Sequence, residues 1–417
     1  MHKDADVLIL GGGVIGLACA HYLQAEGRSV RVIDQGKVGA AASHGNCGTL
    51  TPSHAAPLAA PGMLGQALRW MLRPSAPLYI RPRWDPALWR WLVRVAGRCN
   101  LRHWHATGLA KGALLKYSRA LVEDLVYGQG LDCGFEAGGL HYVFRRRRQL
   151  ERQARELGLL AELGIEASLM DATALAIDEP ALKEGMAGSI FFPGDAQLQP
   201  DRYTAELARV IREGGGAIEE GVCVTGIVRG RHGIESVQTS EGERRASQVV
   251  MALGAWSPLF ASMLGLKIPI QPGKGYSITY ERPATVPRRA LVLKERSVCV
   301  TTWADGYRLG STMEFAGYDQ RLNRTRLDAL ERGAREYLRD PVGPSKREQW
   351  CGWRPMTWDD LPLIGRAPGH TNLWLATGHG MMGMGMSAGT GRLLAELMAG
   401  RAPALDPAPY APARFAG

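Results

Sequence analysis

The chain has 417 residues, 46% of them hydrophobic and 22% charged, which is typical of a soluble globular protein long enough for two domains. Its seven cysteines are scattered and form no C-x-x-C pair, which argues against a disulfide framework and against a zinc site, so no metal is expected. We expect a cytoplasmic protein, because the first predicted strand leaves no room for a signal peptide and no uncharged stretch is long enough to span a membrane.

The chain opens with a pattern typical of dinucleotide binding. A strand, a glycine turn, a helix, a second strand and an acid follow in order: 7–10, Gly11-x-Gly13-x-x-Gly16, 17–24, 30–33 and Asp34. The glycines permit a tight turn, close approach of a pyrophosphate and close packing of helix on strand. The helix N-terminus attracts phosphate, and the acid is placed to accept a hydrogen bond from a ribose hydroxyl. The alternative is a glycine-rich turn in another kind of α/β protein.

Periodicity predicts the remaining elements. They are a helical region to about residue 130, a strand at 139–144, helices at 149–164 and 201–214, strands at 217–222, 224–228 and 249–253, several strands over 268–310, a helix at 324–338, a strand at 373–377, a helix at 384–398 and an extended tail. The four arginines at 145–148 are expected to form a solvated face at the start of a helix.

Together these elements predict an α/β protein of two domains. A Rossmann-like nucleotide-binding domain is assembled from residues 1–56, 194–260 and 352–417. A second, α+β domain with a mainly antiparallel sheet comprises residues 57–193 and 261–351, of which 57–130 are helical.

The net charge of +10 is concentrated between Arg69 and Arg102, where eight arginines and interleaved tryptophans accompany a single acid, Asp85. Apolar residues at helical spacing over 64–71 and 88–95 leave the arginines on the other face. Such a stripe suits a helix lying on an anionic membrane surface. The alternatives are a helical pair that packs on its own domain and, much less favoured, nucleic-acid binding, for which no module is visible.

The chain resembles bacterial FAD-dependent D-amino-acid dehydrogenases, within the superfamily of D-amino-acid oxidase, glycine oxidase and sarcosine oxidase. The resemblance extends over residues 7–415. Its most specific motifs are Ser43-His44-Gly45-Asn46-Cys47-Gly48, the Trp/Arg segment at 67–100, Gly273-Lys274-Gly275-Tyr276-Ser277, the stretch 308–315, Gly352-Trp353-Arg354-Pro355-Met356-Thr357 and Thr377-Gly378-His379-Gly380.

The resemblance implies FAD, bound non-covalently. The residues that it assigns to FAD are Gly11, Gly13, Val14, Ile15, Gly16, Asp34, Gln35, Ser43, His44, Asn46, Gly48, Thr49, Val224, Gly254, Gly378, Gly380, Met381, Met382 and Gly383. Asp34 stands where most relatives have Glu, and either acid can hold the ribose. The N-terminus of the last helix is expected over the flavin N1–C2=O, where its dipole stabilises the reduced flavin.

For the substrate, the resemblance assigns the carboxylate to Arg354, whose planar fork suits bidentate binding, with Tyr276 sharing the role. His379 is expected either to hydrogen-bond the flavin or substrate or to serve the turn. Lys274 is expected to be a solvated loop charge rather than a flavin contact. His54 is a candidate for specificity. The turn at 358–362 departs from the relatives' R-P-x-T-P-D-G-x-P, which leaves the shape of the pocket lip open.

The implied reaction is oxidative deamination of D-amino acids, including cyclic ones such as D-proline or D-hydroxyproline, by hydride transfer from Cα to flavin N5. The electrons are expected to pass to a quinone or respiratory chain, from a protein lying peripherally on the inner face of the cytoplasmic membrane. One alternative is an oxygen-using amine oxidase of the glycine or sarcosine type. Another is an FAD-carrying subunit of a hetero-oligomeric dehydrogenase.

Overall fold

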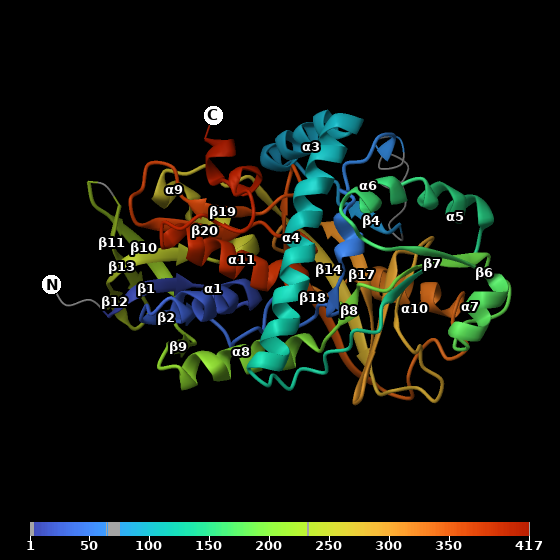
Figure 1. Ribbon diagram of the computed structural model, residues 1–417. Helices are drawn as coiled ribbons and strands as arrows, with labels where there is room; N and C mark the ends of the chain where they lie inside the picture. The colour runs from blue at the N-terminus through green and yellow to red at the C-terminus, as the bar shows by residue number, and fades with distance from the viewer. Residues whose placement is uncertain (1–3, 64, 66–75, 232, 417) are drawn as a thin grey trace.

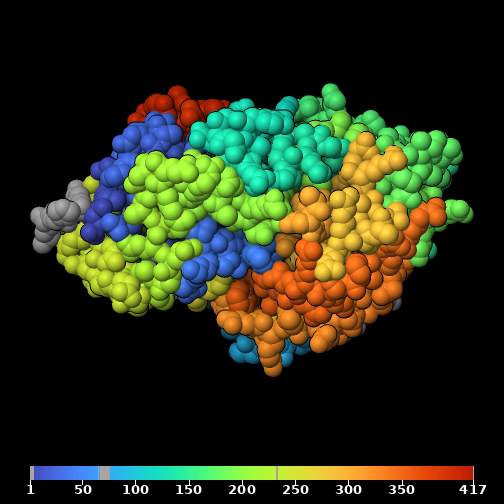
Figure 2. Space-filling model, turned by 90° about the horizontal axis from the view of Figure 1, so that it is seen from below, coloured from blue at the N-terminus to red at the C-terminus, as the bar shows by residue number. Residues whose placement is uncertain are grey.

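The computed structural model describes residues 4–63, 65, 76–231 and 233–416, which form two large sheets with a long helix between them (Figure 1). In the space-filling view from below, the first strands and the β10–β12 region form one lobe and the region of β14–β18 forms the other (Figure 2). The predicted helix at 64–71, apart from Gly65, and with it Arg69, Trp70 and Arg73, lies outside the described residues.

The first sheet has the strand order β19-β20-β13-β1-β2-β9 and is parallel except for β19. Its strands are β1 (Ala5–Leu10), β2 (Val30–Asp34), β9 (Ala217–Glu220), β13 (Ala246–Met251), β19 (Leu363–Arg366) and β20 (Leu373–Thr377). One face packs on the helices α1 (Val14–Ala25), α8 (Pro200–Glu213) and α11 (Gly383–Met398), through core residues such as Val7 and Ile9.

Neighbouring side chains of β1, Leu8 and Leu10, point to the opposite core, because successive residues of a strand face opposite ways. That core is completed by a three-stranded sheet of β10 (Val224–Arg229), β11 (Ile234–Thr239) and β12 (Gly242–Arg244). The 3₁₀ helix η2 (Gly254–Phe260) and α9 (Ala261–Leu264) lie beside it. Both faces of the parallel strands are therefore buried, which explains why these strands carry apolar side chains at successive positions.

The second sheet has nine strands, eight of them in the order β18-β14-β17-β16-β15-β5-β7-β6 and β4 paired with β17. The strands are β4 (Leu78–Ile80), β5 (Leu140–Phe144), β6 (Ser168–Asp171), β7 (Gly188–Phe192), β14 (Ile270–Tyr280), β15 (Ala290–Leu293), β16 (Val298–Trp303), β17 (Gly306–Phe315) and β18 (Lys346–Thr357). Its described pairs are antiparallel except β5 with β15 and β4 with β17. Helix α10 (Arg324–Arg335) packs on one face.

Helix α4 (Leu101–Gly128) runs across the molecule and packs on α11 (Figure 1). Glycines make this approach possible: a Cβ at Gly389 would lie 2.9 Å from Ser118 Cβ, and the Gly389 N–H donates to Ser118 Oγ at 3.0 Å. The predicted helical region, assigned to the second domain, therefore packs on a helix of the first. Further elements are α3 (Pro86–Arg98), α7 (Ala172–Asp178), β3 (Thr49–Leu50), β8 (Ala196–Gln197) and η1 (Pro52–Ala55).

Three predicted elements differ in the structure. The region predicted as helical to about residue 130 also contains strand β4, because residues 78–80 pair with β17. The helix predicted at 149–164 is two helices, α5 (Arg147–Ala154) and α6 (Leu157–Glu162), because α6 turns to bury Leu159 and Leu160 while α5 buries nothing. The predicted extended tail is instead two 3₁₀ turns, η3 (Ala408–Tyr410) and η4 (Pro412–Phe415), held by burial of their aromatic rings. The arginines at 145–148 are exposed at the start of α5, as predicted.

The α/β class with a parallel and a mainly antiparallel sheet agrees with the prediction. The predicted domain boundary at residue 352 falls inside β18, so residues 352–357 belong to the antiparallel sheet. Within the described residues, no helix is both long and apolar enough to cross a membrane.

Candidate active site

A cavity of about 1050 Å³ lies between the two sheets. It begins where β1, β2 and β13 end, at residues such as Gly11, Asp34 and Gly254, and it extends to the face of the second sheet at Cys299 and Arg354. Ligands of open α/β sheets bind at the carboxyl ends of the strands, so this is the expected place for a cofactor. The volume is at the upper end of the roughly 300–1,000 Å³ of small-molecule pockets, which suits a long ligand.

The glycine turn after β1 has the geometry that its spacing predicts. Gly11 has a φ of 108°, and a Cβ there would lie 2.6 Å from the Ala252 carbonyl oxygen at the end of β13. A Cβ at Gly16 would lie 1.9 Å from the Gly11 carbonyl oxygen, so only glycine lets α1 pack this closely on β1. Gly13 is the N-cap of α1 and supplies no side-chain cap, which leaves the first turn of the helix to bind an anion.

The carboxylate of Asp34 is held at the cavity wall by backbone groups. Its Oδ2 accepts from the Gly12 N–H at 2.7 Å, and its Oδ1 accepts from the Gly36 N–H at 2.8 Å. A carboxylate offers about four acceptor positions. Asp34 therefore retains acceptor capacity for a hydroxyl in the cavity.

The loop at 43–49 is fixed by a buried arginine, Arg308. Its Nη1 donates to the carbonyl oxygens of His44 and Asn46, both at 2.7 Å. Ser43 Oγ accepts from the Val14 N–H at 3.1 Å, which ties the loop to the start of α1. The His44 ring pairs with Glu348 at 2.8 Å, and this ion pair raises the pKa of His44. The loop thus presents its backbone to the cavity while His44 contacts β18.

A second helix N-terminus faces the cavity at α11. Its N-cap, Met382, gives no side-chain cap, and Met382 and Gly383 line the cavity. The Gly380 N–H donates to the Pro355 carbonyl oxygen at 3.0 Å, which ties the turn to β18. The His379 ring bonds Thr390 Oγ1 of α11 at 3.0 Å, and burial lowers the pKa of His379 to about 3. His379 is therefore a neutral residue that holds the turn at the cavity wall.

The structure brings most of the predicted cofactor residues together. Those lining the cavity are Gly11, Gly13, Val14, Ile15, Asp34, Gln35, Ser43, Asn46, Thr49, Val224, Gly254, Gly380, Met381, Met382 and Gly383. Four predicted residues stand behind the wall: Gly16, His44, Gly48 and Gly378. They shape it instead, as at Gly48, where a Cβ would lie 1.9 Å from the Leu198 carbonyl oxygen.

Arg354 extends from β18 over the face of the second sheet. It pairs with Gly273 of β14, and a Cβ at Gly275 would lie 2.5 Å from the Arg354 Cζ, so glycines give its guanidinium room. Its Nη1 donates to the Thr312 carbonyl oxygen at 2.8 Å, and its side chain lines the cavity. Burial lowers the pKa of Arg354 to about 10, still well above neutrality. Among the described residues Arg354 has no acidic ion-pair partner, so its remaining donors are available to an anion.

Two predictions on β14 were wrong. Tyr276 is on the opposite face from Arg354, packed in the core against α10, and its hydroxyl donates to Glu314 Oε2 at 2.7 Å. Lys274 is buried on that same face and donates to the Arg321 carbonyl oxygen, so it is not a solvated charge. Both errors follow from strand alternation, which places residues 274 and 276 together and away from Gly273 and Gly275.

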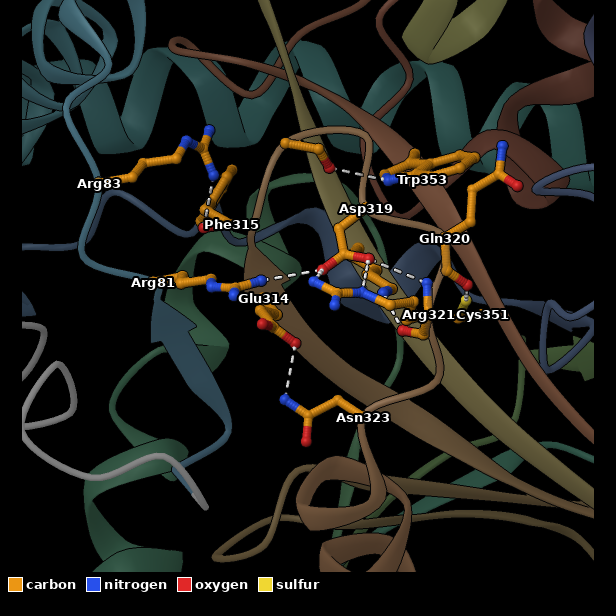
Figure 3. Close-up of polar contacts among 12 residues, drawn as sticks. Arg81, Arg83, Glu314, Phe315, Asp319, Gln320, Arg321, Asn323, Cys351 and Trp353 are labelled. Carbon is orange, nitrogen blue, oxygen red and sulfur yellow. Dashed lines mark hydrogen bonds and ion pairs between the residues drawn. The ribbon is translucent and has the colours of Figure 1, made fainter.

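Glu314 and the loop after β17 belong to a polar network beside β18 (Figure 3). Glu314 also accepts from Asn323 Nδ2 at 3.3 Å, and Trp353 Nε1 donates to the Gly317 carbonyl oxygen at 2.9 Å. Arg81, within the Trp/Arg segment, pairs with Asp319 at 2.9 Å. This network fixes the edge of the sheet from which Arg354 projects.

The Trp/Arg segment forms one wall of the cavity through α3. Trp91 is buried and its Nε1 donates to the Met356 carbonyl oxygen at 3.1 Å, while Arg94 and Arg98 lie over the Trp358 ring. Trp84 is 91% exposed and Val93 is 71% exposed. The segment therefore packs on its own domain along one side and exposes apolar groups along the other.

Comparisons with known proteins agree on one family. The model of the family described as DAO, FAD-dependent oxidoreductase, matches residues 6–397. The chain belongs to this family of FAD-dependent oxidoreductases. It is 35% identical to a D-amino acid dehydrogenase of Granulibacter bethesdensis, covering 99% of this chain and 100% of that protein. It is 36% identical to a D-amino acid dehydrogenase of Chromohalobacter salexigens, over 98% and 99% of the two chains.

Solved structures show the same fold. Glycine oxidase from Geobacillus kaustophilus aligns over 100% of both chains with a TM-score of 0.80 and 24% identity. L-Proline dehydrogenase from P. horikoshii aligns over 100% of this chain and 99% of its own, with a TM-score of 0.75 and 20% identity.

The residues of this oxidoreductase fit FAD. Two helix N-termini whose N-cap residues supply no side-chain cap, those of α1 and α11, face a single cavity, one next to Asp34 and the other next to the antiparallel sheet. The first suits the pyrophosphate and the second suits the flavin ring. Gly11 and Gly16 allow the backbone approach that the pyrophosphate requires.

Sequence reasoning missed four residues of this site. Arg308 and Cys47 were part of quoted motifs but received no role of their own. Cys47 and Cys299 line the cavity and hydrogen-bond each other, and Lys294 lines it from the loop after β15. Arg308 and Cys299 are on β17 and β16, whereas Cys47 and Lys294 are in loops, so only the tertiary fold brings the four side chains together. The alternating glycines 273 and 275 were the available signal for which face of the second sheet meets the cavity, because glycines at every second position of a strand indicate close approach on one face.

Proposed function

We propose that this oxidoreductase oxidises D-amino acids to imino acids, which water hydrolyses to keto acids and ammonia, and that a membrane quinone takes the electrons. The observation that carries the proposal is Arg354, a desolvated cation without an acidic partner among the described residues, facing the cavity next to the turn at 380–383. The full-length relatives named D-amino acid dehydrogenase support the substrate class.

The chain's residues act mainly by orientation. Arg354 binds the α-carboxylate through two parallel N–H groups, which fixes the Cα of the substrate against the helix turn that opens α11. When bound, FAD supplies the two-electron oxidation of the Cα–H bond. His379 and His54 add no positive charge to the cavity at neutral pH, since burial lowers the pKa of each to about 3. Because these two histidines are neutral, they do not compete with Arg354 for the substrate carboxylate.

The acceptor side of the proposal rests on the mouth of the cavity. Trp89 and Val93 of α3 and Leu259 and Met263 of the η2–α9 region line the cavity, and each is also exposed at the surface. An apolar rim of this kind suits a hydrophobic quinone and a membrane surface, with the exposed arginines of α3 near anionic headgroups. The protein would lie on the membrane through this rim.

A direct test uses the purified yellow protein, a panel of D-amino acids and a soluble quinone analogue. The proposal predicts one keto acid and one ammonia per quinone reduced, or a ring imine from D-proline. Consumption of oxygen at the same rate without quinone would instead favour an amine oxidase. Failure of every amino acid to reduce the bound flavin would favour an electron-carrying subunit.

A further inference from the structure

Lys294 is a cation placed in the cavity wall at a distance from Arg354. It follows β15 and lines the main cavity and an adjoining cavity of about 490 Å³. Its Nζ lies 4.2 Å from the centre of the Tyr142 ring, a cation–π contact. Among the described residues it has no salt-bridge or hydrogen-bond partner, although Glu156 and Glu295 are near enough to favour its charge. Desolvated lysines without partners are rare, because leaving a charge unpaired costs stability.

Sheet register places Lys294 and Arg354 on one face. Tyr142 pairs with Val292, Val292 with Cys299, and Cys299 with Gly310, and residues paired in this way point to the same side. Lys294 is two residues beyond Val292 and shares its face. The Arg354 guanidinium already reaches Thr312 on β17. Two strand spacings separate β17 from β15, roughly 10 Å of backbone. The Lys294 ammonium lies over Tyr142 of β5, on the side of β15 away from β17, so the two cations line the cavity at separate places.

A hydrogen-bonded chain fixes the groups around Lys294. The Tyr142 hydroxyl bonds His54 Nδ1 at 2.9 Å and also bonds Ser53, whose Oγ donates to Asp195 Oδ2 at 2.5 Å. The second ring nitrogen of His54 is left for the cavity, which His54 lines. The part of the cavity wall at a distance from Arg354 therefore offers an ammonium group and an imidazole nitrogen, both held by buried neighbours.

We propose that Lys294 and His54 form a subsite that binds an oxygen atom on the side chain of the amino acid whose α-carboxylate is bound by Arg354. This inference rests on the proposed function and narrows its substrate class to D-amino acids carrying a side-chain hydroxyl or carboxylate. The energetic reason is that a substrate oxygen pairs a half-buried ammonium group that has no other partner among the described residues. Sites built in this way reject analogues that lack the oxygen much more strongly than apolar pockets reject a missing methylene.

The test compares shape-matched substrate pairs on the FAD-bound protein. 4-Hydroxy-D-proline with D-proline tests a hydroxyl, and D-glutamate with D-norvaline tests a carboxylate. Stopped-flow bleaching of the flavin without oxygen gives kcat/KM for each. In at least one pair, wild type should prefer the oxygen-bearing member at least 10-fold. Lys294→Met should remove that preference and change the apolar member less than about 3-fold. Lys294→Arg should retain part of it.

Controls separate the possible failures. Lys37→Met removes a lysine whose side chain is 83% exposed and should leave both ratios unchanged. If Lys294→Met does not retain FAD, Lys294→Gln keeps the polar stem without the charge and is used in its place. Equal losses for both members of each pair, or no preference in wild type with clear bleaching by D-proline or D-norvaline, would refute the subsite alone. No bleaching by any D-amino acid would refute the proposed function and the subsite together.

Discussion

Replacing Arg354 by Met should separate the catalytic value of this residue from its effect on folding. Of the roughly five N–H donors of a guanidinium, one goes to the Thr312 carbonyl oxygen, which leaves roughly four, enough for the two that a bidentate carboxylate needs. Two charge-assisted hydrogen bonds at about 1.5–3 kcal/mol each amount to about 3–6 kcal/mol. Since each 1.36 kcal/mol is tenfold in rate, kcat/KM for a D-amino acid should fall roughly 10²- to 10⁴-fold.

The same substitution should not lower stability. Arg354 is a desolvated cation without an acidic partner among the described residues, and an apolar side chain of similar length removes that desolvation cost. We therefore expect an unchanged or higher Tm and full FAD content alongside the kinetic loss. Arg347→Met, at the exposed start of the same strand, is the matched control and should change neither. Unaltered kcat/KM in Arg354→Met, or loss of FAD, would refute the assignment.

Four further predictions follow from the geometry. Gly16→Ala should abolish FAD retention, because the new Cβ would lie 1.9 Å from a backbone oxygen. The control Gly97→Ala, at a glycine with open space around it, should retain FAD. Equal flavin content in the two variants would contradict this prediction. Burial raises the pKa of Asp195 to about 7, above its unfolded value. As pH rises from about 4 to 7, the free energy of unfolding of wild type should therefore fall relative to that of Asp195→Asn, by as much as about 4 kcal/mol. A constant difference between the two proteins in urea unfolding across that pH range would exclude this effect. The Cys299 hydrogen bond, with Arg308 and Arg354 nearby, lowers the pKa of Cys47, whereas burial raises the pKa of Cys19 to about 12. Iodoacetamide should therefore label Cys47 well before Cys19 in a mass-spectrometric time course. The reverse order of labelling would contradict this environment of Cys47. Replacing the exposed Trp84 and Val93 by Ser should weaken sedimentation with anionic vesicles, and a wild type that never sediments would end the membrane proposal.

The part of the site that could be predicted from the sequence is the part made by local structure. The turn from Gly11 to Gly16, its helix and Asp34 lie within one βαβ unit, so spacing alone places them. The turn at Gly378–Gly383 was placed for the same reason, since strand, glycines and helix are contiguous. Family resemblance added the link between these two distant turns.

The substrate wall could not be predicted because it depends on sheet register. Tyr276 and Arg354 lie on neighbouring strands, and whether they share a face depends on a one-residue register that the sequence does not specify. Lys294 lines the cavity because the sheet order places β15 two strands from β17, an order that the sequence does not specify. The turn at 358–362 shows a local compensation: Asp360 takes a φ of 59° and pairs with Lys111 at 2.7 Å. Asp tolerates this left-handed conformation better than most residues, so a turn without the relatives' proline and glycine still forms.

The stereochemistry of the reaction gives the most direct test of the proposed function. Wild-type protein is mixed without oxygen with the D- and L-enantiomers of the same amino acid, and the absorbance of the oxidised flavin is followed. The proposed function predicts rapid and complete bleaching by the D-enantiomer, much slower bleaching by the L-enantiomer, and loss of the D-reaction in Arg354→Met. Bleaching by both enantiomers at equal rates, or by the L-enantiomer alone, would contradict it.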